Sequence, residues 1–114
     1  MADRPGTLSG TGAFAALWEF EIDPACQAEF ERHYGPDGSW VQLFRQSSGY
    51  LGSELLNNRF DSRRYVTIDR WETPEHWQRF RRQFSEQYEA LDRRCQGLTR
   101  RETPLGEYAA RPQP

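Results

Sequence analysis

Residues 64–80, RYVTIDRWETPEHWQRF, change their periodicity within a few positions, and this change limits the possible folds more than any other feature of the chain. Up to position 71, β-branched and aromatic residues favour a strand, whose side chains alternate between two faces. Thr73 then offers an N-cap and Pro74 a first helical residue, so a helix follows at once. One face of the strand brings a carboxylate and an indole together: Tyr65, Thr67, Asp69 and Trp71.

The rest of the chain continues this alternation of strand and helix signals. Asp23 and Pro24 mark one helix start, Asp37 or Ser39 can cap a second, and Gly35 ends the first. The polar turn NRFDSR indicates a hairpin. The predicted elements are a strand 14–22, a helix in two pieces between 24 and 44, strands 50–57 and 64–72, a helix 74–96 and an extended segment 98–108.

Apolar residues recur every three or four positions after Pro74, which fits one face of a single long helix that ends at Gly97. They are Trp77, Phe80, Phe84, Tyr88, Leu91 and Cys95.

The predicted order β-α-β-β-α-β is that of a ferredoxin-like α+β fold, an antiparallel sheet with helices on one face. Apolar side chains nevertheless fall on both faces of the strands, among them Leu17, Leu55, Val66 and Ile68 or their neighbours of opposite parity. A second subunit would cover the face without helices, so we expect a homodimer.

Composition excludes several classes of protein. The net charge is -2, without the basic excess of a nucleic-acid binder, and the third predicted strand lacks the motif of an RNA-binding module. No 18-residue apolar run indicates a membrane helix, and no signal peptide is evident. Cys26 and Cys95 have no metal-ligand spacing. We expect a cytoplasmic protein with neither nucleic acid nor membrane as partner.

A chain of 114 residues is long enough for one domain. Residues 1–12 are polar and rich in glycine, so they are predicted to be a flexible segment before a domain at 13–108, and residues 109–114 a flexible tail.

Several side chains are candidates for chemistry. Asp69 can act as a base if burial raises its pKa, or it can be a structural partner of an arginine. Trp71 can stack on a flat substrate or simply fill the junction between strand and helix. His33 is the better acid–base candidate of the two histidines, and its partner Glu29 gives too few ligands for a metal. Tyr50 can donate a hydrogen bond or merely pack.

The segments YLGSELL at 50–56 and YVTIDRWETPEHW at 65–77, with the aromatic helix after them, resemble the antibiotic biosynthesis monooxygenase family of the dimeric α+β barrel superfamily. The resemblance covers residues 14–108. It implies two sheets packed face to face, with Glu19 near Arg70 inside the barrel and a pocket between each sheet and its own helices. The side chains expected to bind substrate there are Trp18, Phe20, Tyr50, Tyr65, Thr67, Phe84 and Tyr88.

The chain departs from the patterns of two groups within this resemblance. Quinone-forming members carry an Asn where this chain has Thr67. Heme-degrading relatives have an Asn at the position of Trp18 and a late His that is missing here. The resemblance implies a cofactor-independent monooxygenase for a small aromatic or polyketide-like substrate. A non-catalytic binding or stress-related protein is the alternative, and heme degradation fits less well.

Overall fold

The computed structural model describes residues 13–111, which form one antiparallel sheet of four strands in the order β2-β3-β1-β4. The strands are β1 (Phe14–Ile22), β2 (Tyr50–Asn57), β3 (Arg64–Trp71) and β4 (Thr99–Ala109). This is the predicted ferredoxin-like α+β fold. The predicted flexible segment 1–12 lies outside the described residues, as do positions 112–114 of the predicted tail, whose first residue belongs to β4.

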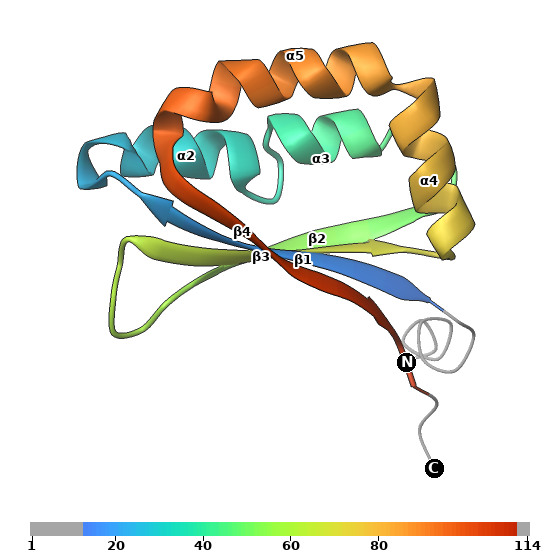
Figure 1. Cartoon of the computed structure of the whole chain (residues 1–114), viewed down its shortest axis with the longest axis horizontal. Coiled ribbons are helices and arrows are strands. Elements are labelled where there is room, and N and C mark those ends of the chain that lie inside the picture. Colours follow the sequence, from blue (N-terminus) through green and yellow to red (C-terminus); the bar gives the residue numbers. More distant parts are fainter. Residues whose placement is uncertain (1–12, 112–114) are drawn as a thin grey trace.

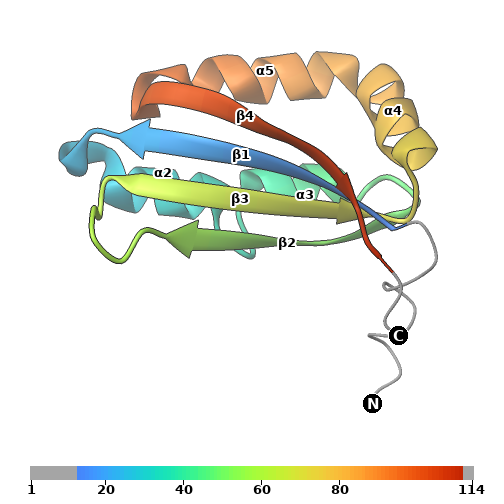
Figure 2. The ribbon, with the colours of Figure 1, turned by 60° about the horizontal axis from the view of Figure 1, so that its bottom comes forward.

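Within residues 13–111, the helices all lie on one face of the sheet and leave the other face bare (Figures 1 and 2). Asp23 accepts a hydrogen bond from the backbone N–H of Ala25 at 3.0 Å and Thr73 accepts one from that of His76 at 3.1 Å, so both predicted caps are confirmed. The helices are η1 (Pro24–Cys26), α2 (Gln27–Tyr34), α3 (Ser39–Phe44), α4 (Pro74–Gln83), α5 (Ser85–Cys95) and η2 (Gln96–Leu98). None of these helices is long and apolar enough to cross a bilayer.

Two details of the predicted helices are wrong. Gly38 is the N-cap of α3 and offers no side chain, so neither Asp37 nor Ser39 caps it. The expected single helix breaks at Phe84, whose φ of -112° and ψ of 29° leave the helical region. The break turns α4 down over one end of the sheet, while α5 runs across it (Figure 1).

The faces of β3 are as predicted. Tyr65, Thr67 and Trp71 are buried beneath the helices, while Val66 and Ile68 between them are partly exposed. β1 matches this parity, because Phe14 pairs with Trp71, Trp18 with Thr67 and Phe20 with Tyr65 in the antiparallel register. Large aromatic side chains from both strands therefore face the helices.

The structure settles which side chains lie on the bare face, and it differs from the prediction in the partner of Arg70. Leu55 pairs with Thr67 and packs against the core, so it is Leu56, 49% exposed, that lies on the outside. Arg70 contacts Glu54 at 3.3 Å and not Glu19. The register explains this difference, since β1 places Glu19 opposite Val66.

Candidate functional site

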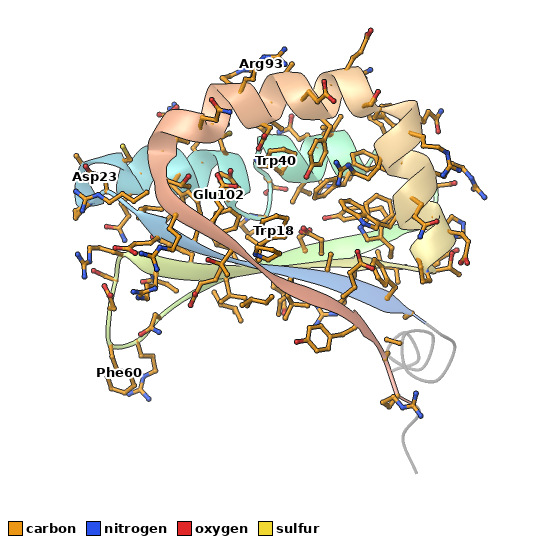
Figure 3. The ribbon with its side chains drawn as sticks, viewed as in Figure 1. Trp18, Asp23, Trp40, Phe60, Arg93 and Glu102 are labelled. Carbon is orange, nitrogen blue, oxygen red and sulfur yellow. The ribbon has the colours of Figure 1, made fainter. Side chains whose placement is uncertain are left out.

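A cavity of about 310 Å³ lies between the sheet and the helices. Figure 3 shows Trp18 and Glu102 between the two layers, with Trp40 facing them from α3. Residues of all four strands and of α2, α3, α4 and α5 line it: Trp18, Phe20, Tyr34, Trp40, Val41, Phe44, Ser53, Glu54, Thr67, Asp69, Trp77, Arg81, Tyr88, Asp92 and Glu102.

About half of the wall residues are aromatic. Trp18 stacks against Phe20 with 6.4 Å between the ring centroids, and the edge of one ring meets the face of the other where Trp40 contacts Tyr88 at 5.0 Å. Such rings present flat apolar surface of fixed orientation. The aromatic part of the wall therefore offers flat apolar surface, while the remainder is largely polar.

Asp69 introduces a carboxylate into this wall. Its Oδ1 accepts a hydrogen bond from the Ser53 hydroxyl at 2.7 Å, and the Ser53 oxygen lies 2.6 Å from the Tyr50 hydroxyl. Removal from water raises the pKa of Asp69 to about 6, and the bond from Ser53 opposes that rise. A carboxyl group with this pKa is largely ionised at neutral pH and can take up a proton from a bound ligand.

Further charged side chains surround Tyr88 on the helix side of the cavity. The Arg81 guanidinium carbon lies 4.1 Å from the centre of the Tyr88 ring and 5.4 Å from that of Trp77. Burial raises the pKa of Tyr88; Arg81 opposes the rise, and the carboxylates of Asp92, Asp69 and Glu102 add to it. Tyr88 therefore stays a neutral phenol that can donate a hydrogen bond.

The structure brings half of the predicted site residues together in the cavity wall. These are Asp69, Trp18, Phe20, Thr67 and Tyr88. The other predicted site residues, Trp71, His33, Tyr50, Tyr65 and Phe84, do not line the cavity.

Trp71 belongs to the hydrophobic core. It is 0% exposed and packs against Tyr50 at 5.2 Å, Phe80 at 5.3 Å and Trp77 at 5.5 Å between ring centroids. Stacking of Trp71 on a substrate is thus a prediction that the structure does not support, because the ring has no free face. The alternative, a ring that fills the junction of strand and helix, matches its position.

Replacing Trp71 by Ala is accordingly expected to lower the free energy of unfolding by about 3–5 kcal/mol, the cost of truncating a large buried ring. Urea denaturation monitored by circular dichroism measures this loss. Phe60→Ala is the matched control, since Phe60 is 88% exposed at the tip of the hairpin and should cost almost nothing. A Trp71→Ala variant as stable as this control would contradict the assignment to the core.

The polar groups of His33 and Tyr65 form hydrogen bonds outside the cavity. The two ring nitrogens of His33 lie 2.8 Å from the Ser39 hydroxyl and 3.2 Å from the Glu29 carboxylate. The Tyr65 hydroxyl contacts the carboxylate of Glu31 on α2, although its ring faces the helices as predicted. Neither side chain reaches the cavity, so the acid–base role expected of His33 has no support in this geometry.

Sequence reasoning missed several residues of the wall, among them Trp40, Ser53, Arg81, Asp92 and Glu102. Only Ser53 carried a usable signal, because a hairpin register that pairs β2 with β3 places it opposite Asp69. Within residues 13–111, no cluster of three or more His, Cys, Asp or Glu side chains is suited to a metal ion.

Comparisons with known proteins agree with this architecture. A variant of SnoaB, a cofactor-independent oxygenase from Streptomyces nogalater, is 22% identical with a TM-score of 0.70, over 90% of this chain and 96% of that one. PA3566 from Pseudomonas aeruginosa is 17% identical with a TM-score of 0.66, over 86% and 93% of the two chains. Rv0793 from Mycobacterium tuberculosis is 16% identical with a TM-score of 0.64, over 90% and 96%.

These similarities are low in sequence and establish the fold alone. No curated protein matches the chain significantly. The family model for antibiotic biosynthesis monooxygenase, in contrast, matches residues 13–92, which is most of the chain. The chain therefore belongs to the antibiotic biosynthesis monooxygenase family.

Proposed function

We propose that this protein is a cofactor-independent monooxygenase that oxygenates a flat aromatic or polyketide-like molecule in the cavity between sheet and helices. The observation that carries the proposal is the Asp69 carboxylate, whose pKa is about 6. It lies in the partly aromatic wall of a cavity of about 310 Å³. The similarity in fold to SnoaB, itself a cofactor-independent oxygenase, supports the same class of reaction.

In the proposed reaction, Asp69 removes a proton from the CH₂ group of an anthrone-like substrate. The resulting carbanion reduces dioxygen and forms a C–O bond, and Asp69 returns the proton to the new peroxide. When Asp69 takes the second proton of the same carbon, the O–O bond breaks and a ketone remains. The departing oxygen leaves with that proton as water. Dioxygen is the oxidant, and both of its oxygen atoms and all electrons are accounted for.

The other wall residues orient the substrate. Trp18 and Trp40 offer flat surfaces, and the neutral Tyr88 hydroxyl can donate to a carbonyl or enolate oxygen on which negative charge develops. Placing Asp69 within reach of the reacting carbon contributes through proximity as well as through basicity.

Oxygen uptake tests this proposal directly. Purified protein is expected to consume dioxygen in the presence of an anthrone or a dihydroxynaphthalene and to yield the quinone. With ¹⁸O₂, one labelled oxygen should appear in the product and one in water. An oxygen electrode and mass spectrometry measure the two, with heat-denatured protein as control.

A non-catalytic binding protein is the second candidate, and one feature of the wall favours it. The position that the resemblance assigns to an Asn holds Thr67, and among the described residues the wall includes no side-chain amide to hold an oxyanion. Quenching of tryptophan fluorescence by the ligand, combined with oxygen uptake at the buffer rate, would support binding and contradict catalysis.

We further propose that the protein is a homodimer in which the bare faces of two sheets meet. Leu56 and Tyr108 are 49% and 55% exposed on strands of this sheet, and Leu17 and Ile68 pair across its middle. Exposed apolar side chains of this kind, here beside the Arg70–Glu54 ion pair, are often covered by a partner in a stable protein.

A further inference from the structure

Two hydroxyl groups lie in series behind the candidate base. The Ser53 hydroxyl donates to Oδ1 of Asp69 at 2.7 Å, and the hydroxyl oxygens of Tyr50 and Ser53 are 2.6 Å apart. A serine hydroxyl has one hydrogen, which here is engaged by Asp69. Tyr50 must therefore be the donor to Ser53, and both hydroxyls direct their hydrogens toward the carboxylate.

This arrangement depends on a bulge in β2. Residues three apart on a regular strand face opposite sides of the sheet, so Tyr50 and Ser53 would normally point apart. The register shifts between Tyr50, opposite Trp71, and Gly52, opposite Arg70, and the extra residue turns both side chains toward the helices. Gly52 has a φ of 142°, which favours glycine, although no atom lies within 4 Å of a side chain there.

Titratable and charged side chains reach the cavity from several elements packed on it, including Tyr34 on α2 and Glu54 on β2. Tyr50 and Ser53 lie on β2, Arg81 on α4, Tyr88 and Asp92 on α5 and Glu102 on β4. Within residues 13–111, Ser53 supplies the one hydrogen bond from a side chain to Asp69, and it goes to Oδ1. The second carboxylate oxygen is thus not held by another side chain.

Building on the proposed role of Asp69 as a base, we propose that Ser53 and Tyr50 are positioning residues: their hydroxyls hold Oδ1 in place, so that Oδ2 serves as the proton acceptor. Gly52 allows the bulge in β2 that turns the Tyr50 and Ser53 side chains to the same face.

Two opposing effects then set the protonation of the base. Burial favours the neutral acid, whereas a donor on Oδ1 favours the carboxylate. The hydroxyl pair therefore keeps Asp69 ionised at lower pH than burial alone would allow. Tyr50 acts through Ser53, because a hydroxyl that accepts a hydrogen bond becomes a better donor.

The test is a titration of Asp69 in ligand-free protein with ¹³C-labelled aspartate, followed by NMR and assigned with Asp69→Asn. Ser53→Ala is expected to raise the pKa of Asp69 by about one pH unit, the effect of losing one hydrogen bond to a charged group. Ser53→Thr keeps the hydroxyl and should restore the wild-type value. Ser62→Ala, an exposed serine in the hairpin turn, is the matched control and should change nothing.

Two more variants test the rest of the series. Tyr50→Phe should raise the pKa by a smaller amount, since Ser53 still donates. Gly52→Ala strains the bulge and should shift the pKa in the same direction as Ser53→Ala. Circular dichroism checks that each variant is folded.

An unchanged pKa in folded Ser53→Ala, or an equal shift in Ser62→Ala, would overturn the proposal. A shift in Ser53→Ala with none in Tyr50→Phe would overturn the part assigned to Tyr50. The titration needs no substrate, so its outcome is separate from that of the oxygenase assay. If the pKa shifts appear but no oxygen is consumed, the proposed reaction is rejected and the positioning role is not. In an active enzyme, the acidic limb of the pH–rate profile should move with the titrated pKa.

Discussion

Asp69→Asn is expected to lower the rate of oxygen uptake by about 10²–10⁴-fold, the usual contribution of a general base. The amide keeps the shape of the side chain and can still accept from Ser53, but it cannot take up a proton. Binding of substrate should change little, so the loss falls on kcat. Oxygen uptake under saturating substrate, with a parallel binding titration, separates the two.

The matched control is Asp37→Asn, the same chemical change on a side chain that is 88% exposed at the start of α3. It should leave the rate unaltered. If Asp69→Asn were as active as this control, Asp69 would be a structural residue and the base would have to be sought elsewhere.

The same group sets an expected pH dependence. Activity that needs the carboxylate should rise with pH and level off above about 6. The sign for stability is opposite: burial raises the pKa of Asp69 above its ordinary value of 3.8, so the folded chain binds this proton more tightly than the unfolded one. The free energy of unfolding that Asp69 contributes therefore decreases as the pH rises from about 4 to about 6. The Asp69→Asn variant should lose this pH dependence.

Ile68→Asp is expected to dissociate the dimer. In the isolated protomer Ile68 is partly exposed on the bare face, opposite Leu17 and Glu54, so the new carboxylate would be hydrated and the fold retained. In the dimer the same carboxylate would be buried without a partner, which costs several kcal/mol. Light scattering should give twice the 13.4 kDa protomer mass for wild type and the single mass for the variant.

Gln87→Asp places a carboxylate on the exposed side of α5 and serves as the control, which should stay dimeric. A wild-type protein that is monomeric at micromolar concentration would contradict the dimer itself. An Ile68→Asp variant that remains dimeric would show that the subunits meet through another surface.

The alternation of residues was enough to predict which face of each strand is covered. Tyr65, Thr67 and Trp71 do lie beneath the helices, because a period of two fixes the face regardless of what packs on it. The caps at Asp23 and Thr73 were equally local and therefore visible in the sequence.

The sequence did not predict which residues along β3 line the cavity. Tyr65 lies at one end of β3, where Glu31 of α2 meets its hydroxyl, and Trp71 lies at the other, where α4 covers it. Only Thr67 and Asp69, between them, line the cavity. Which of these residues forms a site depends on where the helices close over the sheet, and that is a property of tertiary packing.

The helix break and the strand bulge could not be predicted from the sequence pattern either. The helix breaks at Phe84 without a glycine or proline, and its apolar stripe is continuous across the break. The bulge near Gly52 had a glycine to mark it, but a glycine in a strand has several explanations. Both features depend on contacts between distant segments.

The aromatic part of the cavity wall is also part of the hydrophobic core, and this limits how such a protein can diverge. Phe20, Trp40, Phe44 and Trp77 belong to both sets, so a substitution that reshapes the cavity through them also removes core packing. Thr67, Arg81, Asp92 and Glu102 line the cavity without belonging to the core cluster. Evolution or engineering toward a new ligand is therefore least constrained by stability at this polar half, while substitutions in the aromatic half also cost core packing.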